Sequence, residues 1–383
     1  MVYKLAGTCR ASLPKDTLNR IVPLCSKLGI TRIANIAGLD NIGIPVITCI
    51  RPRAKHLTTS QGKGVTEELA TISAIMEAIE GFHVENAPPA QLEGMFSELC
   101  QKNQLFNPNL FVRSIFSSIN LEHMTLKWIE ATEIVSNNKF FIPHCLIDLD
   151  STMFHPEYSY LCISSNGLAA GNTSEEAICH ALYELIERDA LLEWKKLDAA
   201  SRLATQLDIE SIDANELRLL IKQISQAGIS LKVWDITSSI GIPAYQCAIY
   251  ENNPLRKLGI STGSGAHLSK EIALSRAITE AVQSRVVMIS GSRDDVFQDF
   301  YAAQSKISDV LCTTSIANGA RQYSACISPT YALSLSENID QIKQNLVSCG
   351  HKQILVFDHT KPEIDIPVVQ VFVPGLGSDL SRI

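Results

Sequence analysis

Pairs of oxygen-bearing side chains three positions apart recur in three segments of this 383-residue chain. The pairs are Glu77 with Glu80, Glu184 with Glu187, and Glu280 with Gln283. Residues three apart lie on one face of a helix, so each pair projects its oxygen atoms together. Carboxylate and amide oxygens are hard ligands that suit Mg²⁺, an ion that often bridges to nucleotide phosphates. The spacing therefore indicates a magnesium–nucleotide site.

The neighbours of these acids bear on this interpretation. A single pair of acids on a helix usually belongs to a solvated face. Here the pairs stand in SAIMEAIE, HALYELIE and RAITEAVQ, where apolar residues surround each acid. Because an unpaired carboxylate on a partly buried face is costly, three such faces favour a bound cation. Solvated helix faces are the alternative.

Glycines and small polar residues open each of the three segments, which span 60–83, 164–190 and 261–285. We expect the openings to be loops, since glycine lets backbone N–H groups approach phosphate oxygens and a helix N-terminus favours an anion. The candidate cations are Lys63, Arg188, Arg276 and Arg285. Alternatively, Lys63 only caps a turn and Arg188 only pairs with a neighbouring acid, Glu184 or Asp189. GxxxxGK[ST] is absent, as is GxGxxG at a strand–helix junction, which excludes both common nucleotide-binding signatures.

The elements that position these residues follow from the apolar patterns. Short apolar runs typical of strands lie at 44–51, 140–149, 231–236, 242–250, 353–359 and 367–374. Helical patterns lie at 14–28, 65–84, 174–195, 213–227, 269–289 and 336–348. No linker or charge block divides the chain. We therefore expect a mixed α/β (α+β) fold in one integrated domain over 1–383, with a motif-bearing core at about 60–290 and a candidate peripheral insertion at 85–125.

Composition narrows the classes of function. Lys and Arg number 33 against 40 Asp and Glu, and the net charge of −7 argues against a broad basic nucleic-acid surface. No apolar run is long enough to span a membrane, and the N-terminus lacks the apolar core of a signal peptide. The 11 cysteines form no CxxC pair, which argues for reduced thiols rather than a zinc site. These features predict a cytoplasmic protein without a nucleic-acid or membrane partner.

Together, the three motifs resemble those of the YcaO family, whose members use ATP to activate a peptide backbone amide. The first family signature, Ser-x3-Glu-x2-Glu-Arg, is matched by Ser73, Glu77 and Glu80, with Gly81 where the family has Arg. The second runs from a Ser-Asn-Gly loop into Glu-x2-Glu-Arg and is matched by Asn166, Gly167, Asn172, Glu176, Glu184, Glu187 and Arg188. The third region is matched by Arg276, Glu280 and Gln283. Similarity extends to 29–52 and 371–377, so the resemblance covers most of the chain.

This resemblance implies ATP and Mg²⁺ as cofactors and a YcaO-like fold, with β-sheets packed by helices around a central nucleotide cleft. The implied metal ligands are Glu77, Glu80, Glu184, Glu187, Glu280 and Gln283. The implied nucleotide contacts are Arg10, Lys63, Ser73, Asn166, Asn172, Glu176, Arg188 and Arg276. Since Gly81 replaces the signature Arg, we expect Arg10, Arg276 or Arg285 to supply that charge.

The resemblance also implies a precursor peptide or protein as substrate, as in the biosynthesis of ribosomally made, modified peptides, and a homodimer. The chain ends in PGLGSDLSRI and not in the PxPxP tail common in azoline-forming members, and no fused partner domain is evident. These features resemble stand-alone members that form thioamides with a TfuA-type partner. An azoline-forming cyclodehydratase acting on Cys, Ser or Thr, a non-catalytic nucleotide-binding scaffold and an unrelated ATP-dependent ligase are the alternatives.

A catalytic base is not evident from the sequence. His180 lies four residues before Glu184 and His267 lies in GSGAHLSK, but a lone histidine is more often structural. Cys162 and Cys179 flank the second motif, and we expect them to be buried thiols rather than sulfur carriers. We expect the three tryptophans to fill the core, namely Trp128, Trp194 and Trp234.

Overall fold

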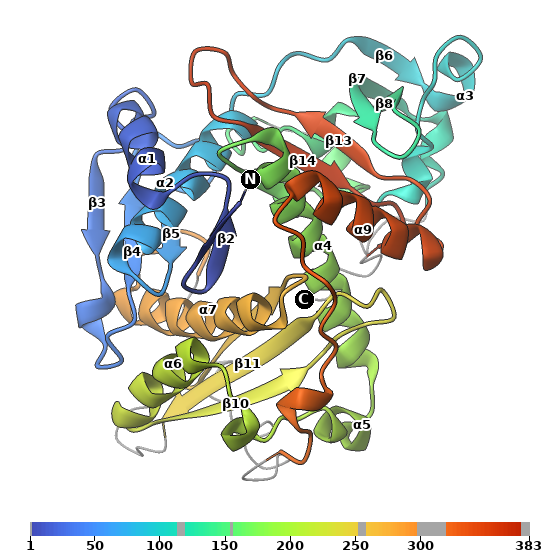
Figure 1. The fold of residues 1–383 in the computed structure, drawn as a ribbon. Helices are drawn as coiled ribbons and strands as arrows, with labels where there is room; N and C mark the ends of the chain where they lie inside the picture. Colours follow the sequence, from blue (N-terminus) through green and yellow to red (C-terminus); the bar gives the residue numbers. More distant parts are fainter. Residues whose placement is uncertain (1, 113–118, 154–155, 252–257, 297–318, 377–383) are drawn as a thin grey trace. The chain divides into compact units, whose positions relative to one another are not determined.

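Antiparallel sheets with packed helices build this protein, for which the structure is a computed structural model (Figure 1). It describes residues 2–112, 119–153, 156–251, 258–296 and 319–376. Residues 113–118 of the candidate insertion lie outside these ranges. So do residues 377–383, which make up most of the PGLGSDLSRI ending that was compared with the PxPxP tail. The chain divides into two compact units that alternate along the sequence. The expectations of one integrated domain and of a central cleft stay predictions.

The first unit comprises Met1–Arg53, Leu57–Ala78 and Glu193–Leu333. Its antiparallel sheets are β1 (Tyr3–Leu5) with β2 (Thr8–Arg10), β3 (Arg32–Asn35) with β4 (Val46–Ile50) and β5 (Thr59–Lys63), and β10 (Ile229–Asp235) with β11 (Ala244–Glu251) and β12 (Ile260–Ala266). Its helices are α1 (Pro14–Ile21), α5 (Ala199–Ala204), α6 (Asn215–Gln226), α7 (Lys270–Ser290) and most of α2 (Glu67–Val84).

Helix α7 is the central helix of the first unit. It packs along β12 and β11, while α6 covers β10 (Figure 1). Leu274, Ile278 and Val282 of α7 are fully buried, and so are the alanines between them. A helix buried on several sides needs apolar residues around most of its circumference, which explains why its acid stands among apolar residues.

The second unit comprises Ala54–His56, Ile79–Leu192 and Ser334–Ile383. Its sheet has the order β6 (Leu92–Met95), β7 (Thr125–Glu133), β13 (Leu355–Asp358), β14 (Val368–Phe372) and β9 (Leu168–Ala170), and β8 (Asn138–Pro143) also pairs with β7. Its helices are α3 (Phe96–Leu99), α9 (Leu335–Ser348), the end of α2 and most of α4 (Ser174–Lys196). The candidate insertion supplies the edge strand β6 and helix α3.

The six predicted helices are present, but two predicted elements end six or seven residues before the expected end. The helix expected over 14–28 ends at Ile21, followed by a 3₁₀ turn over Val22–Leu24. Pro23 lacks the N–H that an α-helix needs and its ring crowds the preceding turn. The strand expected over 140–149 ends at Pro143, where the chain enters a 3₁₀ turn over His144–Leu146.

The prediction that glycine-rich loops precede the motif helices is wrong for the first and third segments, which open with strands β5 and β12. In the second segment a loop over 164–167 is present and leads into the short strand β9. Glycine is disfavoured in strands, but here it lets a strand lie against a helix backbone. A Cβ added at Gly64, Gly171 or Gly265 would lie 2.6–2.7 Å from the backbone nitrogen of a helical alanine, Ala70, Ala177 or Ala277 respectively. We call β5, β9 and β12 the glycine strands, because a glycine within or directly after each of them packs on a helix backbone.

The third glycine strand and its helix differ from the other two pairs. Glu77 and Glu184 each follow the packed alanine by seven residues, whereas Glu280 follows Ala277 by three. An α-helix has 3.6 residues per turn, so along the helix the acid of α7 lies about one turn nearer to the alanine that packs on the glycine. The pairs share a spacing without being structurally equivalent.

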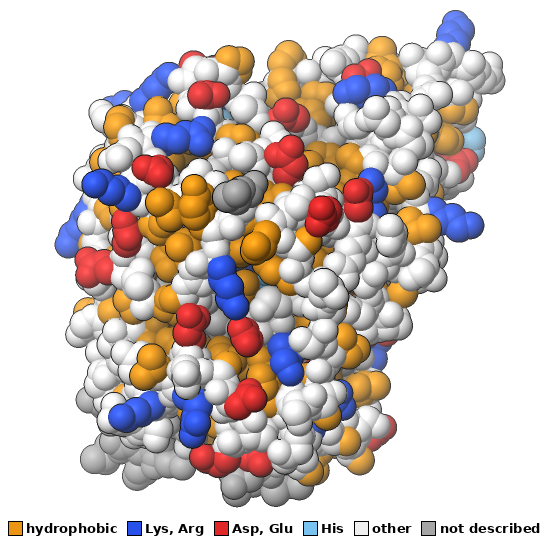
Figure 2. Space-filling view, in the orientation of Figure 1, with side chains coloured by type: hydrophobic (Ala, Val, Ile, Leu, Met, Phe, Trp, Pro, Cys, Tyr) orange, Lys and Arg blue, Asp and Glu red, His pale blue; other side chains and the backbone are white. Residues whose placement is uncertain are grey.

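Charged side chains of both signs are dispersed over the face drawn in Figure 2, with hydrophobic side chains between them. This mixture fits a net charge of −7 made from 33 basic and 40 acidic residues. Within the described ranges, no helix combines the length and apolar composition that crossing a bilayer requires.

Candidate functional site

Strand β5 joins the first and third motifs within the first unit. The Lys63 ammonium and the Glu280 carboxylate form an ion pair although they are 217 positions apart, and these side chains are only 16% and 26% exposed. The Gln61 N–H donates to Oε2 of Glu77 over 3.1 Å, and Gln283 Nε2 donates to the Gln61 carbonyl oxygen over 2.7 Å. Four predicted site residues from α2, β5 and α7 are thus brought together.

Backbone N–H groups of the glycine strands orient the acids in both units. In the first unit, the Ser264 N–H donates to Oε1 of Glu280 over 3.2 Å. In the second, the Ala170 N–H of β9 donates to Oε1 of Glu80 on α2 over 2.7 Å. A carboxylate has about four lone-pair sites, so one such bond fixes its direction and leaves acceptor capacity for a cation. Sequence reasoning missed these donors, because backbone groups of apparent loops give no residue signal.

Two predicted cations of the first unit act electrostatically on one histidine. His267 is buried, and its Nδ1 accepts the Ser269 N–H over 2.9 Å. Burial, and then the positive charges of Arg276 and Arg10, hold its pKa well below 6.5. A neutral imidazole whose Nδ1 already accepts a hydrogen bond is a poor general base. The Nε of Arg276 is buried and has no hydrogen-bond partner among the described residues, so an anionic ligand would satisfy it.

The remaining predicted contacts of the first unit lie on β2 and α2. Arg10 ends β2, and its Nη1 donates to the Cys9 carbonyl oxygen over 3.4 Å. Ser73 is half-buried on α2, one turn before Glu77. The structure thus gives the positions of Arg10 and Ser73, and their contacts with a nucleotide stay predictions.

The second unit groups its predicted residues around α4. Asn172 Nδ2 donates to both carboxylate oxygens of Glu176 over 3.2 and 3.3 Å, and the two residues are 8% and 3% exposed. Glu184 and Arg188 form an i,i+4 ion pair at 3.7 Å. Glu187 is only 3% exposed. Carboxylates so poorly hydrated require cations or strong donors around them.

Asn166 belongs to the loop that leads into β9. Its N–H donates to the hydroxyl of Ser164 over 3.3 Å. Ser164 is held in turn, because its carbonyl oxygen accepts Nε2 of Gln370 over 3.2 Å. The Ser-Asn-Gly loop is therefore anchored to β14.

The predicted metal ligands divide between the units. Glu77, Glu280 and Gln283 belong to the first, whereas Glu80, Glu184 and Glu187 belong to the second. Among the described residues, no three His, Cys, Asp or Glu side chains come together as a metal site. The donor set contains only oxygen ligands, which fits Mg²⁺, an ion that binds few carboxylates and completes its shell with water and phosphate.

Arg285 is not a phosphate cation, contrary to the prediction. It is 1% exposed and its Nε donates to Oδ2 of Asp40 over 2.8 Å. Its Nη2 also donates to Glu251 over 3.0 Å. The carboxylates of Asp40 and Glu251, with side chains 2% and 15% exposed, already neutralise this guanidinium, although its buried Nη1 has no hydrogen-bond partner among the described residues. Arg10 and Arg276 therefore remain the candidates to replace the Arg missing at Gly81.

Cys179 and the three tryptophans are buried as predicted, whereas Cys162 is only half-buried. Burial raises the pKa of Cys179 to about 12 and also raises the pKa of Cys162. Thiols in this state are poor nucleophiles near neutral pH. The three tryptophans are buried, with exposures of 0% for Trp128, 7% for Trp194 and 4% for Trp234.

Comparison with known proteins gives matches along nearly the whole chain. Residues 61–377 match a family described as YcaO cyclodehydratase, ATP- and Mg²⁺-binding. An uncharacterized protein in the tfuA 3′ region of Rhizobium leguminosarum bv. trifolii is 33% identical over 97% of this chain and 89% of its own length. An uncharacterized protein of Methanothermobacter thermautotrophicus is 30% identical over 96% of this chain and 94% of its own length.

Two solved structures share the fold at 21% identity. YcaO from Methanopyrus kandleri, bound with AMPPCP and Mg²⁺, superposes with a TM-score of 0.77 over 100% of this chain and 96% of its own. A heterocyclase in complex with substrate and cofactor gives 0.79 over 98% of this chain, which spans only 54% of that longer protein. These matches confirm the predicted mixed α/β fold.

Proposed function

The chain belongs to the YcaO family of ATP- and Mg²⁺-dependent enzymes that modify peptide backbones, and from this premise we propose that it forms thioamides. In this proposal ATP and Mg²⁺ are the cofactors of the reaction, bound by the predicted site residues. The observation that best supports a nucleotide site is that β5 links four predicted site residues through an ion pair and hydrogen bonds, namely Lys63, Glu77, Glu280 and Gln283. Residues so far apart in sequence form one polar group in the first unit, as a shared ligand requires.

The chemical difficulty is the amide oxygen, a poor leaving group. Hydrosulfide adds to the amide carbon, and the resulting oxyanion attacks the γ-phosphorus of ATP with release of ADP. Phosphate then leaves with the former amide oxygen and takes the hydrosulfide proton, while sulfur stays doubly bonded to carbon. The protein contributes positioning and charge stabilisation rather than covalent chemistry.

Named residues supply those contributions. Lys63, Arg188 and Arg276 bind phosphate oxygens, and Asn172 with Glu176 orients the nucleotide at the start of α4. The six predicted ligands hold Mg²⁺, which, when bound, neutralises phosphate charge and orients the triphosphate. His267 is neutral and its Nδ1 accepts a backbone hydrogen bond, so in this proposal it lines the site as a polar side chain and does not act as a base.

The relative in the tfuA 3′ region supports thioamidation with a TfuA-type partner. The test incubates the protein with ATP, Mg²⁺, sulfide, the partner and a precursor peptide encoded nearby, and reads peptide mass. Exchange of one oxygen for sulfur is the expected result. Loss of one water would instead identify azoline formation, and an unchanged peptide despite bound nucleotide would favour a scaffold role.

Glu184→Gln separates an enzyme from a scaffold. The variant keeps the side-chain size but removes a charge from the proposed metal set, so ATP-dependent modification should be lost. Glu193→Gln is the matched control, because Glu193 is exposed on the same helix and pairs only at the surface with Lys196. A scaffold that does not use nucleotide would support its partner equally well with either variant.

A further inference from the structure

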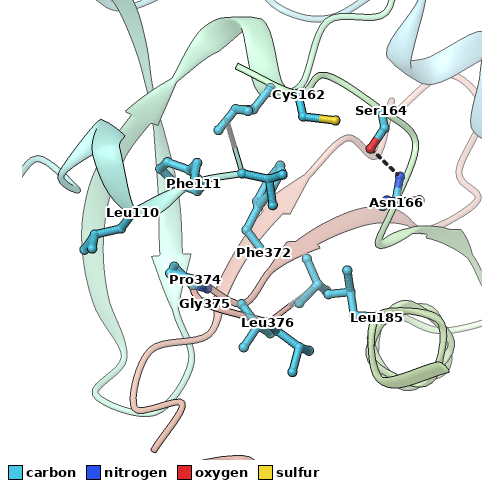
Figure 3. A pocket seen from close by; sticks show the side chains of 14 residues that line it. Leu110, Phe111, Cys162, Ser164, Asn166, Leu185, Phe372, Pro374, Gly375 and Leu376 are labelled. Carbon is cyan, nitrogen blue, oxygen red and sulfur yellow. Dashed lines mark hydrogen bonds between the residues drawn. The ribbon is translucent and has the colours of Figure 1, made fainter. Parts of the chain in front are cut away.

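A small cavity of about 70 Å³ lies in the second unit, between the loop 162–166, helix α4 and the end of β14 (Figure 3). Its wall is mainly apolar and includes Leu110, Phe111, Leu185, Phe372 and Leu376. Ser164 and Asn166 form a polar edge on one side, close to the thiol of Cys162 (Figure 3). Burial raises the pKa of that thiol, so it adds no charge to the wall.

The cavity shares its elements with the second motif. Leu185 directly follows Glu184 and lies three residues before Arg188, on the same helix. Asn166 is the central residue of the Ser-Asn-Gly loop, and its side-chain amide makes no hydrogen bond with the described residues. The cavity is therefore next to residues proposed to bind the nucleotide, yet it is lined with groups that suit an uncharged ligand.

Size restricts what the cavity accepts. An apolar protein cavity of about 150 Å³ holds one benzene molecule. About half that volume suits the end of a branched aliphatic side chain and is too small for a purine. An amide at the polar edge can both donate and accept, as a peptide main chain requires.

We propose that this cavity binds an aliphatic side chain of the peptide substrate, close to the amide that is activated. The proposal rests on the proposed function, in which the amide oxygen must reach the γ-phosphate. The peptide must therefore bind beside the phosphate-binding residues, and the apolar wall next to Glu184 and Asn166 meets that condition. The enzyme should accordingly prefer Val, Leu or Ile next to the modified residue.

The test measures alkylation of Cys162 by iodoacetamide, quantified by peptide mass spectrometry, in the full-length protein without ATP. The probes are N-acetyl-leucine-N′-methylamide and its glycine and lysine counterparts. At about ten times its Kd, the leucine probe should slow alkylation of Cys162 about tenfold, because only the unoccupied fraction reacts. Exposed Cys100 is the internal control, and its rate should not change.

Three outcomes would overturn the proposal: equal protection by the glycine probe, equal protection by the lysine probe, or protection by adenosine in place of leucine. Leu185→Trp fills the cavity and should abolish the protection by leucine. If this variant does not fold, the probe series on the unaltered protein decides alone. ATP-dependent phosphate release, measured separately, tests the proposed function, so failure of one is distinguishable from failure of the other.

Discussion

Arg285 and Asp40 form an ion pair inside the first unit, with Nε donating to Oδ2 over 2.8 Å and side-chain exposures of only 1% and 2%. The second acid, Glu251 at the end of β11, receives Nη2 over 3.0 Å. The guanidinium therefore connects α7 with β11 and with the turn that follows Ala37–Leu39. An arginine held in this way stabilises the fold and is not available to a phosphate.

Asp40→Ala should lower the free energy of unfolding by about 3–5 kcal/mol, because it leaves a buried guanidinium short of its partner. Urea denaturation followed by circular dichroism measures the change. Replacing both members, as Asp40→Leu with Arg285→Met, should recover much of the loss. A change in Asp40→Ala below about 1 kcal/mol would contradict this structural role.

Glu77→Gln should raise the Mg²⁺ concentration for half-maximal ATP turnover by about tenfold or more, the equivalent of 1.4 kcal/mol. The amide oxygen can still accept the Gln61 N–H, so the variant loses charge without losing that bond. Glu68→Gln, exposed in the first turn of α2, is the control. The same Mg²⁺ dependence in both variants would remove Glu77 from the metal set.

The helices were predictable from sequence because their apolar periodicity is local. The acids of α2, α4 and α7 stand among apolar residues for the reason predicted, since these helices are largely buried. The YcaO resemblance followed from the same motifs and is confirmed by the family match over 61–377.

Features set by partners distant in sequence were not predictable. Glycines in TSQGK and ISTGSGA favour loops locally, yet both segments are strands because each glycine faces a helix backbone. From the sequence alone, Arg285 and Arg276 were likewise equally good candidates to bind phosphate. Only the fold places Asp40, 245 positions away, against its guanidinium.

Gly62→Ala tests the close contact between β5 and α2. The added Cβ would lie 2.0 Å from the Ala70 carbonyl oxygen and 2.2 Å from the Ala74 nitrogen, both backbone atoms that cannot move independently. We expect a loss of about 3 kcal/mol or more in unfolding free energy. Gly38→Ala is the matched control, since its Cβ would meet nothing within 4 Å. If both variants unfold at the same urea concentration, β5 is not packed as described.

His359 should make the stability of the second unit depend on pH. Its Nε2 donates to Oε1 of buried Gln370 over 3.3 Å, and Gln370 in turn holds the Ser164 carbonyl oxygen. Burial is the main cause that lowers the pKa of His359 to about 3, against an ordinary 6.5. The folded state thus requires the neutral imidazole. Its contribution is complete above pH 6.5 and is lost progressively as pH falls from 6.5 toward 3.

The expected loss within that window is about 1.4 kcal/mol for each pH unit. Unfolding free energies of the natural protein and of His359→Gln, measured by urea denaturation from pH 8 to pH 4, isolate this contribution. The variant keeps an amide donor for Gln370 but cannot titrate, so its curve should fall less steeply below pH 6.5. From pH 7 to 8 the two curves should differ by a constant. Parallel curves down to pH 4 would mean that protonation of His359 does not oppose folding, and that the anchor of the Ser-Asn-Gly loop tolerates the charged ring.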